Sequence, residues 1–552
     1  MHRPSLVPFA AALLLPLGPL LGQQGYKNFE NKHKGITFVY PASHDELPLP
    51  PTERLWVAKY VMRQQPDELK KVDERLFQAE TPFLQVFRFE LPGAVTPSGA
   101  RPADGAAAEG AAAAGAAGDE GPPVLTWEQF ATMLGRLELR PDPKKPDHFT
   151  VHPRLRGRGP GRGKDAEANE FEGYLVRRLD GQRVVGVIGF SYQPGAKTLQ
   201  SQVTRMAASI KEVADDAAER ADAEIDRLYA SGKFQAVAWR KQARAKMAKG
   251  WKALDTENYL IVHHSTNAAL IRRIARDIEA MRAFYAEQFP PSKPIDAVAI
   301  VRVCRTKDEY HEYGGPPSTG GYWHPVNEEL VFYDYSYTMQ KMDTREKRQL
   351  GGHTLSDDDS LLVLYHEALH QYMHYAIGEF APHDWFNEGY GDYFSGAVVG
   401  ESTGKVLRVD PSPWRIHLAK DMCEHGEGFL SLKDVLHAER ATFYNPARAG
   451  HYYAAAWSFV HFLKHGKAVQ GNPKWAALLA GYFDTVKAEY ARATEGVAAG
   501  DQQQRAMASM KARREALKKV LDGIDLQALE AAWVQYVVAM KDPWPQLRKQ
   551  RK

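Results

Sequence analysis

The stretch Leu361–Phe394, LLVLYHEALHQYMHYAIGEFAPHDWFNEGYGDYF, constrains this chain of 552 residues more than any other. It contains His366-Glu367-Ala-Leu-His370, the pattern HExxH. Residues four apart in a helix lie one turn above each other, so both imidazoles leave the same face. Glu367 is turned by about 100° from His366, which suits a general base better than a ligand of the same ion. The pattern predicts half of a tetrahedral zinc site.

The residues around HExxH independently predict a helix. Ser356 and Asp359 stand at capping-box spacing within an acidic run that favours a helix N-terminus. Gly378 and Pro382 predict its end. The residues Leu362, Leu369, Met373 and Ile377 recur at helical spacing and give it an apolar flank.

A second segment, WFNEGYGDYFSGAVV from Trp385 to Val399, is interpreted as another helix packed antiparallel to the first. Glu388 in this segment can complete the coordination sphere. Asp392 lies one turn later and can accept the second N–H of a ligand histidine, which fixes the tautomer of that ring. The alternative is two polar residues on a solvated helix face, because a chance HExxH is expected in about one chain in twenty of this composition.

At HEALHQ and WFNEGYGDYF the sequence resembles the gluzincin zinc metallopeptidases, and most closely the peptidase MA-like group of secreted bacterial proteins. The resemblance covers roughly residues 255 to 545. It implies an α+β, thermolysin-like catalytic domain in which a small mixed sheet precedes a mostly helical C-terminal part. It also implies the site residues: zinc bound by His366, His370 and Glu388, catalysis by Glu367, and support from Asp392.

Three further expectations concern the surroundings of HExxH, and the first and third of them come from the resemblance. The strand upstream of the HExxH helix, residues 328–335, would be the sheet edge that pairs with an extended substrate, although it can also be an ordinary edge strand. Gly320–His324 is expected as the floor of the cleft or as a tight turn. Tyr453 stands four residues before Trp457, as a tyrosine does in the resembling group, and would donate to the oxyanion. Tyr452 and His451 remain alternatives to Tyr453, and a core tyrosine is the other reading.

Departures from the family narrow the activity. The spacing from HExxH to the glutamate is one or two residues shorter than in the best known gluzincins, and no GxMEN aminopeptidase signature is present. We therefore expect an endopeptidase rather than an exopeptidase. The third histidine of a metzincin would fall at position 376, which is Ala376. His374 is interpreted as a surface or packing residue.

The N-terminus predicts export. Residues 1–22 combine a short basic start, an apolar run interrupted by prolines, and small or polar residues after it, which is typical of a signal peptide. No other stretch is long and apolar enough for a membrane span, so we expect a periplasmic or extracellular protein.

The formal net charge of +3 calls for no polyanionic partner. Two cysteines, Cys304 and Cys423, allow at most one disulfide.

The rest of the chain divides by composition. Residues 23–211 predict a smaller α+β domain, with strands at 35–40 and 83–91, helices at 52–64 and 200–210, and a hairpin at Asp180-Gly181. An Ala, Gly and Pro-rich insertion near residues 92–123 is expected to be disordered. The basic segment RLRGRGPGRGK, residues 154–164, is interpreted as a solvated loop rather than a nucleic-acid contact.

Residues 212–254 predict a helical linker, either one helix or a pair, and residues 255–545 the metallopeptidase domain. This domain is expected to begin with strands at 258–264, 297–303 and 329–334 around a helix at 268–288. A helix is expected over 452–463, and residues 472–540 are expected to be entirely helical.

These expectations combine into one functional hypothesis. An exported peptidase would hydrolyse peptide or protein substrates with a zinc-bound water that Glu367 activates as general base. One alternative is a non-catalytic exported binding or scaffold protein that has kept a zinc fold, and another is a hydrolase of non-peptide amides. The sequence does not fix the oligomeric state or the natural substrate.

Overall fold

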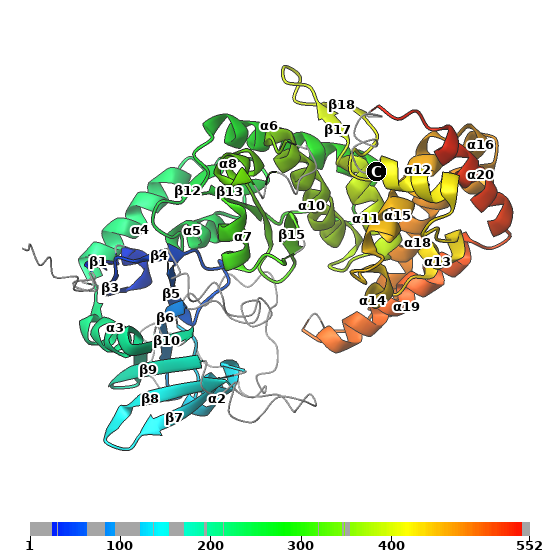
Figure 1. Ribbon diagram of the computed structural model, residues 1–552. Coiled ribbons are helices and arrows are strands. Elements are labelled where there is room, and N and C mark those ends of the chain that lie inside the picture. The colour runs from blue at the N-terminus through cyan, green and yellow to red at the C-terminus, as the bar shows by residue number, and fades with distance from the viewer. Residues whose placement is uncertain are drawn as a thin grey trace, which may run out of the picture.

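The computed structural model describes most of the chain in mixed α+β structure, as predicted. The described residues are 25–29, 31–62, 83–93, 122–135, 137–153, 171–192, 196–213, 215–317, 319–344, 347, 354–498 and 500–543. The predicted signal peptide, most of the predicted insertion and the basic segment 154–164 lie outside them. In Figure 1 the chain passes from an N-terminal sheet, through a second sheet in the centre, to a group of C-terminal helices.

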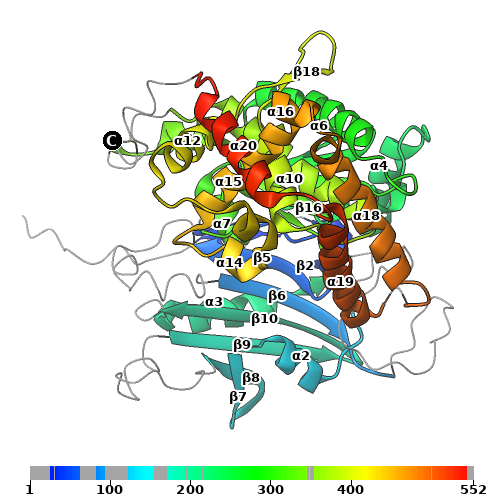
Figure 2. The same cartoon turned by 90° about the vertical axis from the view of Figure 1, so that its right-hand side faces the viewer.

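The N-terminal sheet is antiparallel and seven-stranded, in the order β4-β5-β6-β10-β9-β8-β7. Its strands are β4 (His44–Leu47), β5 (Trp56–Met62), β6 (Phe83–Glu90), β7 (Leu137–Asp142), β8 (Lys145–Pro153), β9 (Phe171–Asp180) and β10 (Arg183–Tyr192). The predicted hairpin at Asp180-Gly181 joins β9 to β10, with Gly181 at φ +60°. Figure 2 shows β6, β10 and β9 side by side.

Each face of this sheet carries an apolar cluster, because alternate residues of a strand point to opposite faces. Helix α3 (Ala196–Ser209), expected at 200–210, packs on β9 and β10 through Leu199 and Val203, beside Val185 and Val187. On the other face, Phe130 of α2 (Trp127–Met133) belongs to the same cluster as Phe87 and Phe89. Two short sheets complete this part, formed by β1 (Tyr26–Asn28) with β3 (Val39–Pro41) and β2 (Ile36–Thr37) with β11 (Lys211–Glu212).

The helix expected at 52–64 is wrong, because residues 56–62 form strand β5 between β4 and β6. The register shifts between Trp56 and Ala58, and this irregularity disturbs the alternation that marks a strand. Pairing with strands distant in sequence outweighs the local pattern here.

The segment expected to form one helix or a pair contains two helices, α4 (Asp215–Tyr229) and α5 (Val237–Ala245). Arg240 of α5 is fully buried and donates to Asp255 Oδ1 at 2.9 Å and to the carbonyl of Tyr259 at 2.8 Å. These hydrogen bonds join α5 to the strands that follow it in the chain.

That second sheet has the order β12-β13-β14-β16-β15. Its strands are β12 (Lys252–Asp255), β13 (Tyr259–His263), β14 (Ala299–Cys304), β15 (Gly321–His324) and β16 (Glu329–Tyr333), and its helices are α6 (Ala268–Gln288), α7 (Lys307–Tyr313) and α8 (Tyr335–Lys341). Strands β13, β14 and β16 are parallel, and β12 and β15 are antiparallel to their neighbours. The expectation that 328–335 is the sheet edge is wrong: β16 lies between β14 and β15, and Gly321–His324 forms the edge.

The remaining elements are helical except for one hairpin. The helices are α10 (Asp357–Ile377), α11 (Asp384–Phe394), α12 (Ile416–His425), α13 (Leu432–His437), α14 (Arg440–Phe443), α15 (Ala449–His465), α16 (Lys467–Gln470), α17 (Pro473–Ala476), α18 (Leu478–Ala493), α19 (Gln502–Val520) and α20 (Leu526–Ala539), and the hairpin is β17 (Ala397–Val399) with β18 (Val406–Val409). The helix expected over 385–399 therefore ends at Phe394. Within the described part of the chain, no helix has the length and apolar character that crossing a membrane requires.

Candidate metal centre

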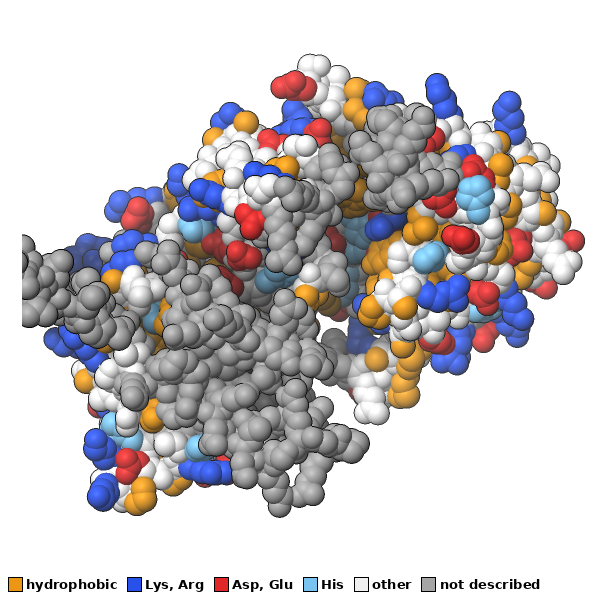
Figure 3. All heavy atoms as spheres, viewed as in Figure 1, with side chains coloured by type: hydrophobic (Ala, Val, Ile, Leu, Met, Phe, Trp, Pro, Cys, Tyr) orange, Lys and Arg blue, Asp and Glu red, His pale blue; other side chains and the backbone are white. Residues whose placement is uncertain are grey.

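Helix α10 carries HExxH and is bounded as predicted. The backbone N–H of Ser356 donates to Asp359 Oδ2 at 2.8 Å in a capping box, and the helix ends at Gly378, whose φ of +125° disfavours a side chain. In Figure 1, α10 lies between the second sheet and the C-terminal helices. Figure 3 shows that the surface is hollowed between these two parts, with histidine side chains in the hollow.

Helix α11 brings Glu388 and Asp392 against α10 because two of its positions lack a side chain. A Cβ on Gly391 would lie 2.7–2.9 Å from three atoms of the His366 ring, and one on Gly389 would lie 2.7 Å from the carbonyl oxygen of Ala456 in α15. A larger residue at 389 would therefore require movement of the α15 backbone, and one at 391 would displace the His366 ring. The two glycines let α11 fit between α10 and α15.

Three predicted ligands converge at this contact. Glu388 Oε2 lies 3.0 Å from His366 Nε2 and 3.4 Å from His370 Nε2, and one ligand atom from each residue lies within 4.8 Å of the others. Two donors that bind one tetrahedral zinc ion at 2.0–2.2 Å lie about 3.3 Å apart. Both distances agree with that separation, and the two imidazoles and one carboxylate are a donor set that suits zinc.

The orientation of His366 also fits a cation. Its Nδ1 lies 3.3 Å from Asp392 Oδ1, so a neutral ring with its proton on Nδ1 would direct an Nε2 lone pair at the Glu388 carboxylate. Although burial opposes it, the Asp392 and Glu388 carboxylates raise the pKa of His366 to about 10. The two carboxylates thus favour positive charge at this ring, and a divalent cation between His366 Nε2 and Glu388 Oε2 would supply it.

Glu367 lies between the two histidines and the edge strand β15. A Cβ on Gly321 would lie 3.2 Å from Glu367 Cγ, and the backbone of Trp323 hydrogen-bonds the carboxylate. Burial raises the pKa of Glu367, while the imidazoles of His370 and His366 counteract this rise. The carboxyl group is thus placed beside both the ligands and an edge where an extended chain can pair.

Asp392 has a partner that the sequence did not indicate. It is fully buried, and its Oδ2 accepts from Arg415 Nε at 2.5 Å while Oδ1 faces His366. The guanidinium of Arg415 lies 4.7 Å from the ring centroid of Tyr453. Arg415 therefore neutralises a carboxylate that would otherwise be costly to bury.

Of the three candidate oxyanion donors, Tyr453 is the one that faces the ligands. Its ring centroid lies 6.4 Å from that of His366, and burial and the Glu388 carboxylate raise its pKa well above the usual range. Tyr452 is buried against Phe443 at 5.3 Å between ring centroids, and His451 lies against Gly428.

Sequence reasoning missed Tyr444, which contacts a predicted ligand. Its hydroxyl donates to Glu388 Oε1 at 2.6 Å and lies 3.2 Å from Asp384 Oδ1. No spacing rule connects Tyr444 or Arg415 to HExxH, because both residues lie at helix ends far along the chain. The sequence offered only a general signal for these two residues: tyrosine and arginine commonly donate hydrogen bonds to buried carboxylates.

His374 is not part of the cluster of ligand atoms. Its ring lies 6.0 Å from Trp323 and 5.1 Å from Tyr375, and burial lowers its pKa to about 4. It packs among aromatic rings, which is the second of the two roles, surface or packing, that the sequence left open.

A second acidic group lies on α12, where Asp421, Glu424 and His425 bring ligand atoms together. Glu424 and His425 are exposed, and Lys420 Nζ lies 3.1 Å from Glu424 Oε1. The lysine competes with a cation at this position, so the group has the character of a surface ion pair.

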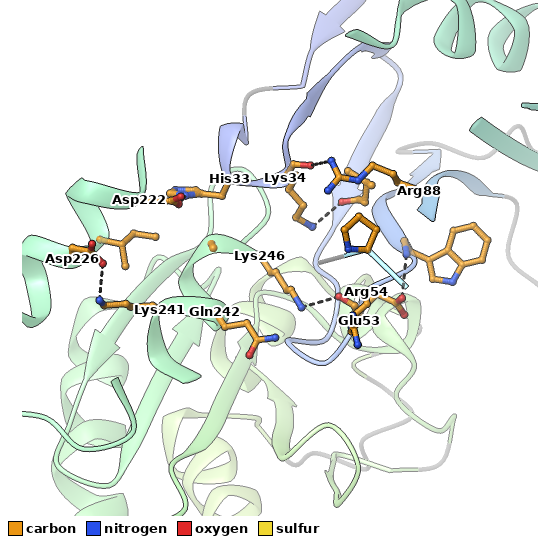
Figure 4. A pocket seen from close by; sticks show the side chains of 15 residues that line it. His33, Lys34, Glu53, Arg54, Arg88, Asp222, Asp226, Lys241, Gln242 and Lys246 are labelled. Carbon is orange, nitrogen blue, oxygen red and sulfur yellow. Dashed lines mark hydrogen bonds and ion pairs between the residues drawn. The ribbon is translucent and has the colours of Figure 1, made fainter. Parts of the chain in front are cut away.

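A cavity of about 400 Å³ lies between the N-terminal sheet and the pair α4 and α5 (Figure 4). Its charged walls are engaged within the chain: Lys34 Nζ donates to the carbonyl of Val57 at 2.7 Å, and Lys241 pairs with Asp226 at 2.6 Å. Burial lowers the pKa of Lys34 to about 8. None of the predicted site residues lines this cavity.

Comparison with known proteins identifies no family. No family model matches the chain, and no curated protein matches it. Among solved structures, the chain is similar to the solution structure of cyanobacterial PsbP (CyanoP) from Synechocystis sp. PCC 6803, at 13% identity over 36% of this chain and 99% of that chain. The TM-score is 0.19, which is too low to support an inference.

Proposed function

We propose that the protein is an exported zinc-dependent endopeptidase of the gluzincin type, with a thermolysin-like catalytic domain. The observation that carries the proposal is the convergence of His366, His370 and Glu388 in a geometry suited to one tetrahedral ion, with Glu367 alongside. Three protein ligands leave a fourth position open, and an open position distinguishes catalytic from structural zinc sites.

Zinc at these ligands would polarise a scissile carbonyl and lower the pKa of a coordinated water towards about 7. Glu367 takes the proton of the attacking water and passes it to the leaving nitrogen. Tyr453 donates to the carbonyl oxygen as negative charge develops, an interaction worth about 3 kcal/mol. Asp392 holds the His366 ring with Nε2 free to bind.

The edge strand β15 supports a peptide as the substrate. It ends the second sheet and passes Glu367 at Gly321 and Trp323. An extended peptide that adds to this edge would carry its backbone carbonyls past the general base. Pairing along a sheet edge engages the peptide backbone and needs no chain terminus, which favours internal bonds and agrees with the missing aminopeptidase signature.

A non-catalytic zinc-fold scaffold is the main alternative, and Glu367 argues against it, because a binding protein has no need of a carboxylate held beside the ligands. A hydrolase of non-peptide amides would use the same groups but would have no need of the edge β15.

The test is the metal content and proteolytic activity of the purified chain without residues 1–22. We expect about one zinc ion per chain and cleavage of unfolded casein that a chelator abolishes and added zinc restores. Bound zinc without cleavage would favour the scaffold, and cleavage of small amides alone would favour the other hydrolase. Absence of metal binding would overturn the proposal.

A further inference from the structure

The two oxygens of the Glu388 carboxylate have different surroundings. Oε2 faces the two imidazoles at 3.0 and 3.4 Å, whereas Oε1 accepts a hydrogen bond from the Tyr444 hydroxyl at 2.6 Å. Glu388 is only 4% exposed, so water cannot readily replace that donor. The carboxylate therefore has one oxygen directed at the ligand cluster and one held by a phenol.

Tyr444 is itself held in place from two sides. The Arg440 guanidinium lies 4.6 Å from the centroid of its ring, and Arg440 Nη1 lies 3.2 Å from Asp384 Oδ1. The Tyr444 hydroxyl lies 3.2 Å from the same Asp384 oxygen but has a single proton to donate. Its shorter contact is to Glu388, and Arg440 provides the positive charge for Asp384.

We propose that Tyr444 is a positioning residue that restricts Glu388 to binding the metal through one oxygen. The proposal rests on the proposed zinc site. A carboxylate can bind an ion through one or both oxygens, and a second oxygen would occupy the position that water needs. With Oε1 held by the phenol and Oε2 directed at the imidazoles, an ion would be bound through Oε2 and the fourth position would stay open.

This role differs from that of Tyr453. Tyr453 lies beside the ring of His366 and the guanidinium of Arg415, where a substrate carbonyl would come. Tyr444 acts on the opposite, outer oxygen of a ligand. Loss of the Tyr453 hydroxyl should therefore slow the reaction without changing the metal, whereas loss of the Tyr444 hydroxyl should change the metal itself.

The experiment compares Tyr444→Phe with Tyr536→Phe, a matched control. The control loses a hydrogen bond of similar length, between the Tyr536 hydroxyl and His461 Nδ1 at 2.8 Å, away from the ligands. Zinc affinity is measured by competition with a chromophoric chelator, and coordination by the visible spectrum of the cobalt-substituted protein. We expect Tyr444→Phe to weaken zinc binding 10- to 100-fold and to reduce the cobalt absorption, as five-coordinate cobalt absorbs less than tetrahedral cobalt.

Tyr536→Phe should match the parent in both measurements. Arg440→Met, which keeps the phenol but removes its cationic support, should weaken zinc binding by a smaller factor and provides a second variant if Tyr444→Phe folds poorly. A parent that binds zinc while both variants keep its affinity and cobalt spectrum would overturn the role of Tyr444 alone. A parent that binds no metal would instead overturn the proposed function.

Discussion

The N-terminal sheet and the C-terminal half bury different kinds of side chain. Among the described residues up to 213, the polar residues that are almost completely buried are His44, Ser191 and Gln202, and none is a carboxylate or guanidinium group. The C-terminal half buries many ionisable groups, among them Asp277, Arg302, Glu329, Asp334, His366, Glu388, Asp392 and Lys420. Because burying a charge is costly unless it is paired, these groups show where the chain holds charge away from water.

Buried charge in the C-terminal half is of two kinds. Arg302 and Glu329 join β14 to β16 at 2.5 Å, and Tyr313 also donates to Glu329, so both oxygens of this carboxylate have a partner within the chain. Around Glu388, two imidazoles converge on one carboxylate oxygen, and in the proposed function this cluster holds the metal ion. The first kind of buried charge joins two strands, and the second belongs to the candidate metal centre.

The largest effect should come from Glu367→Gln. The amide cannot take a proton, so we expect activity on casein to fall by up to about 10⁴-fold, or about 5.5 kcal/mol, with zinc content unchanged. Activity and metal content are measured on the same preparation. A variant that cleaves as fast as the parent would remove Glu367 from the mechanism and weaken the distinction between the two kinds of buried charge.

The structural pair should respond through stability instead. Glu329→Gln leaves Arg302 buried without a counter-charge, and we expect the free energy of unfolding to fall by about 3–5 kcal/mol. Urea denaturation followed by tryptophan fluorescence measures this loss, and zinc affinity at low urea should equal that of the parent. A loss of zinc affinity without a loss of stability would contradict the assignment of this pair to the fold.

The smallest effect concerns the boundary between the two regions. Burial and the carboxylates of Asp308, Glu309 and Asp45 raise the pKa of Glu312 to about 7, although Lys59 opposes the rise. Between pH 4.5 and 7 the folded protein binds the extra proton, so stability decreases as pH rises through this window.

Glu312→Gln should abolish that decrease. We expect the variant to be more stable than the parent at pH 8 by about 1–2 kcal/mol, and equal to it at pH 4.5. Thermal denaturation of both proteins at the two pH values gives the comparison. Equal stability at pH 8 would show that the carboxyl group is solvated and that the boundary carries no buried charge.

Local signals in the sequence predicted the elements that carry the site. The capping box at Ser356, the glycine at 378 and the helical spacing of apolar residues placed α10 correctly. The hairpin at Asp180-Gly181 and helix α6 over 268–288 are likewise set by turn chemistry and periodicity. These features depend on neighbours in the sequence, so a single sequence contains them.

Features that depend on distant pairing were not predictable in the same way. Strand β5 was mistaken for a helix, and β16 for the sheet edge, because neighbours far along the chain decide both. In the site, His366, His370 and Glu388 were brought together as expected. Tyr444 and Arg415 were missed, because each contacts a buried carboxylate in the folded chain but stands at no fixed spacing from a sequence motif.

The absence of a side chain at Gly391 leaves the His366 imidazole resting directly on the backbone of α11. One added methyl group, as in Gly391→Ala, would displace the ring and separate it from the other two ligands, and the zinc content of that variant would report it. A substitution at residue 391 would thus abolish metal binding although glycine itself binds nothing. The residue at this position would then distinguish a metal-binding chain from one that binds no metal in spite of three intact ligands.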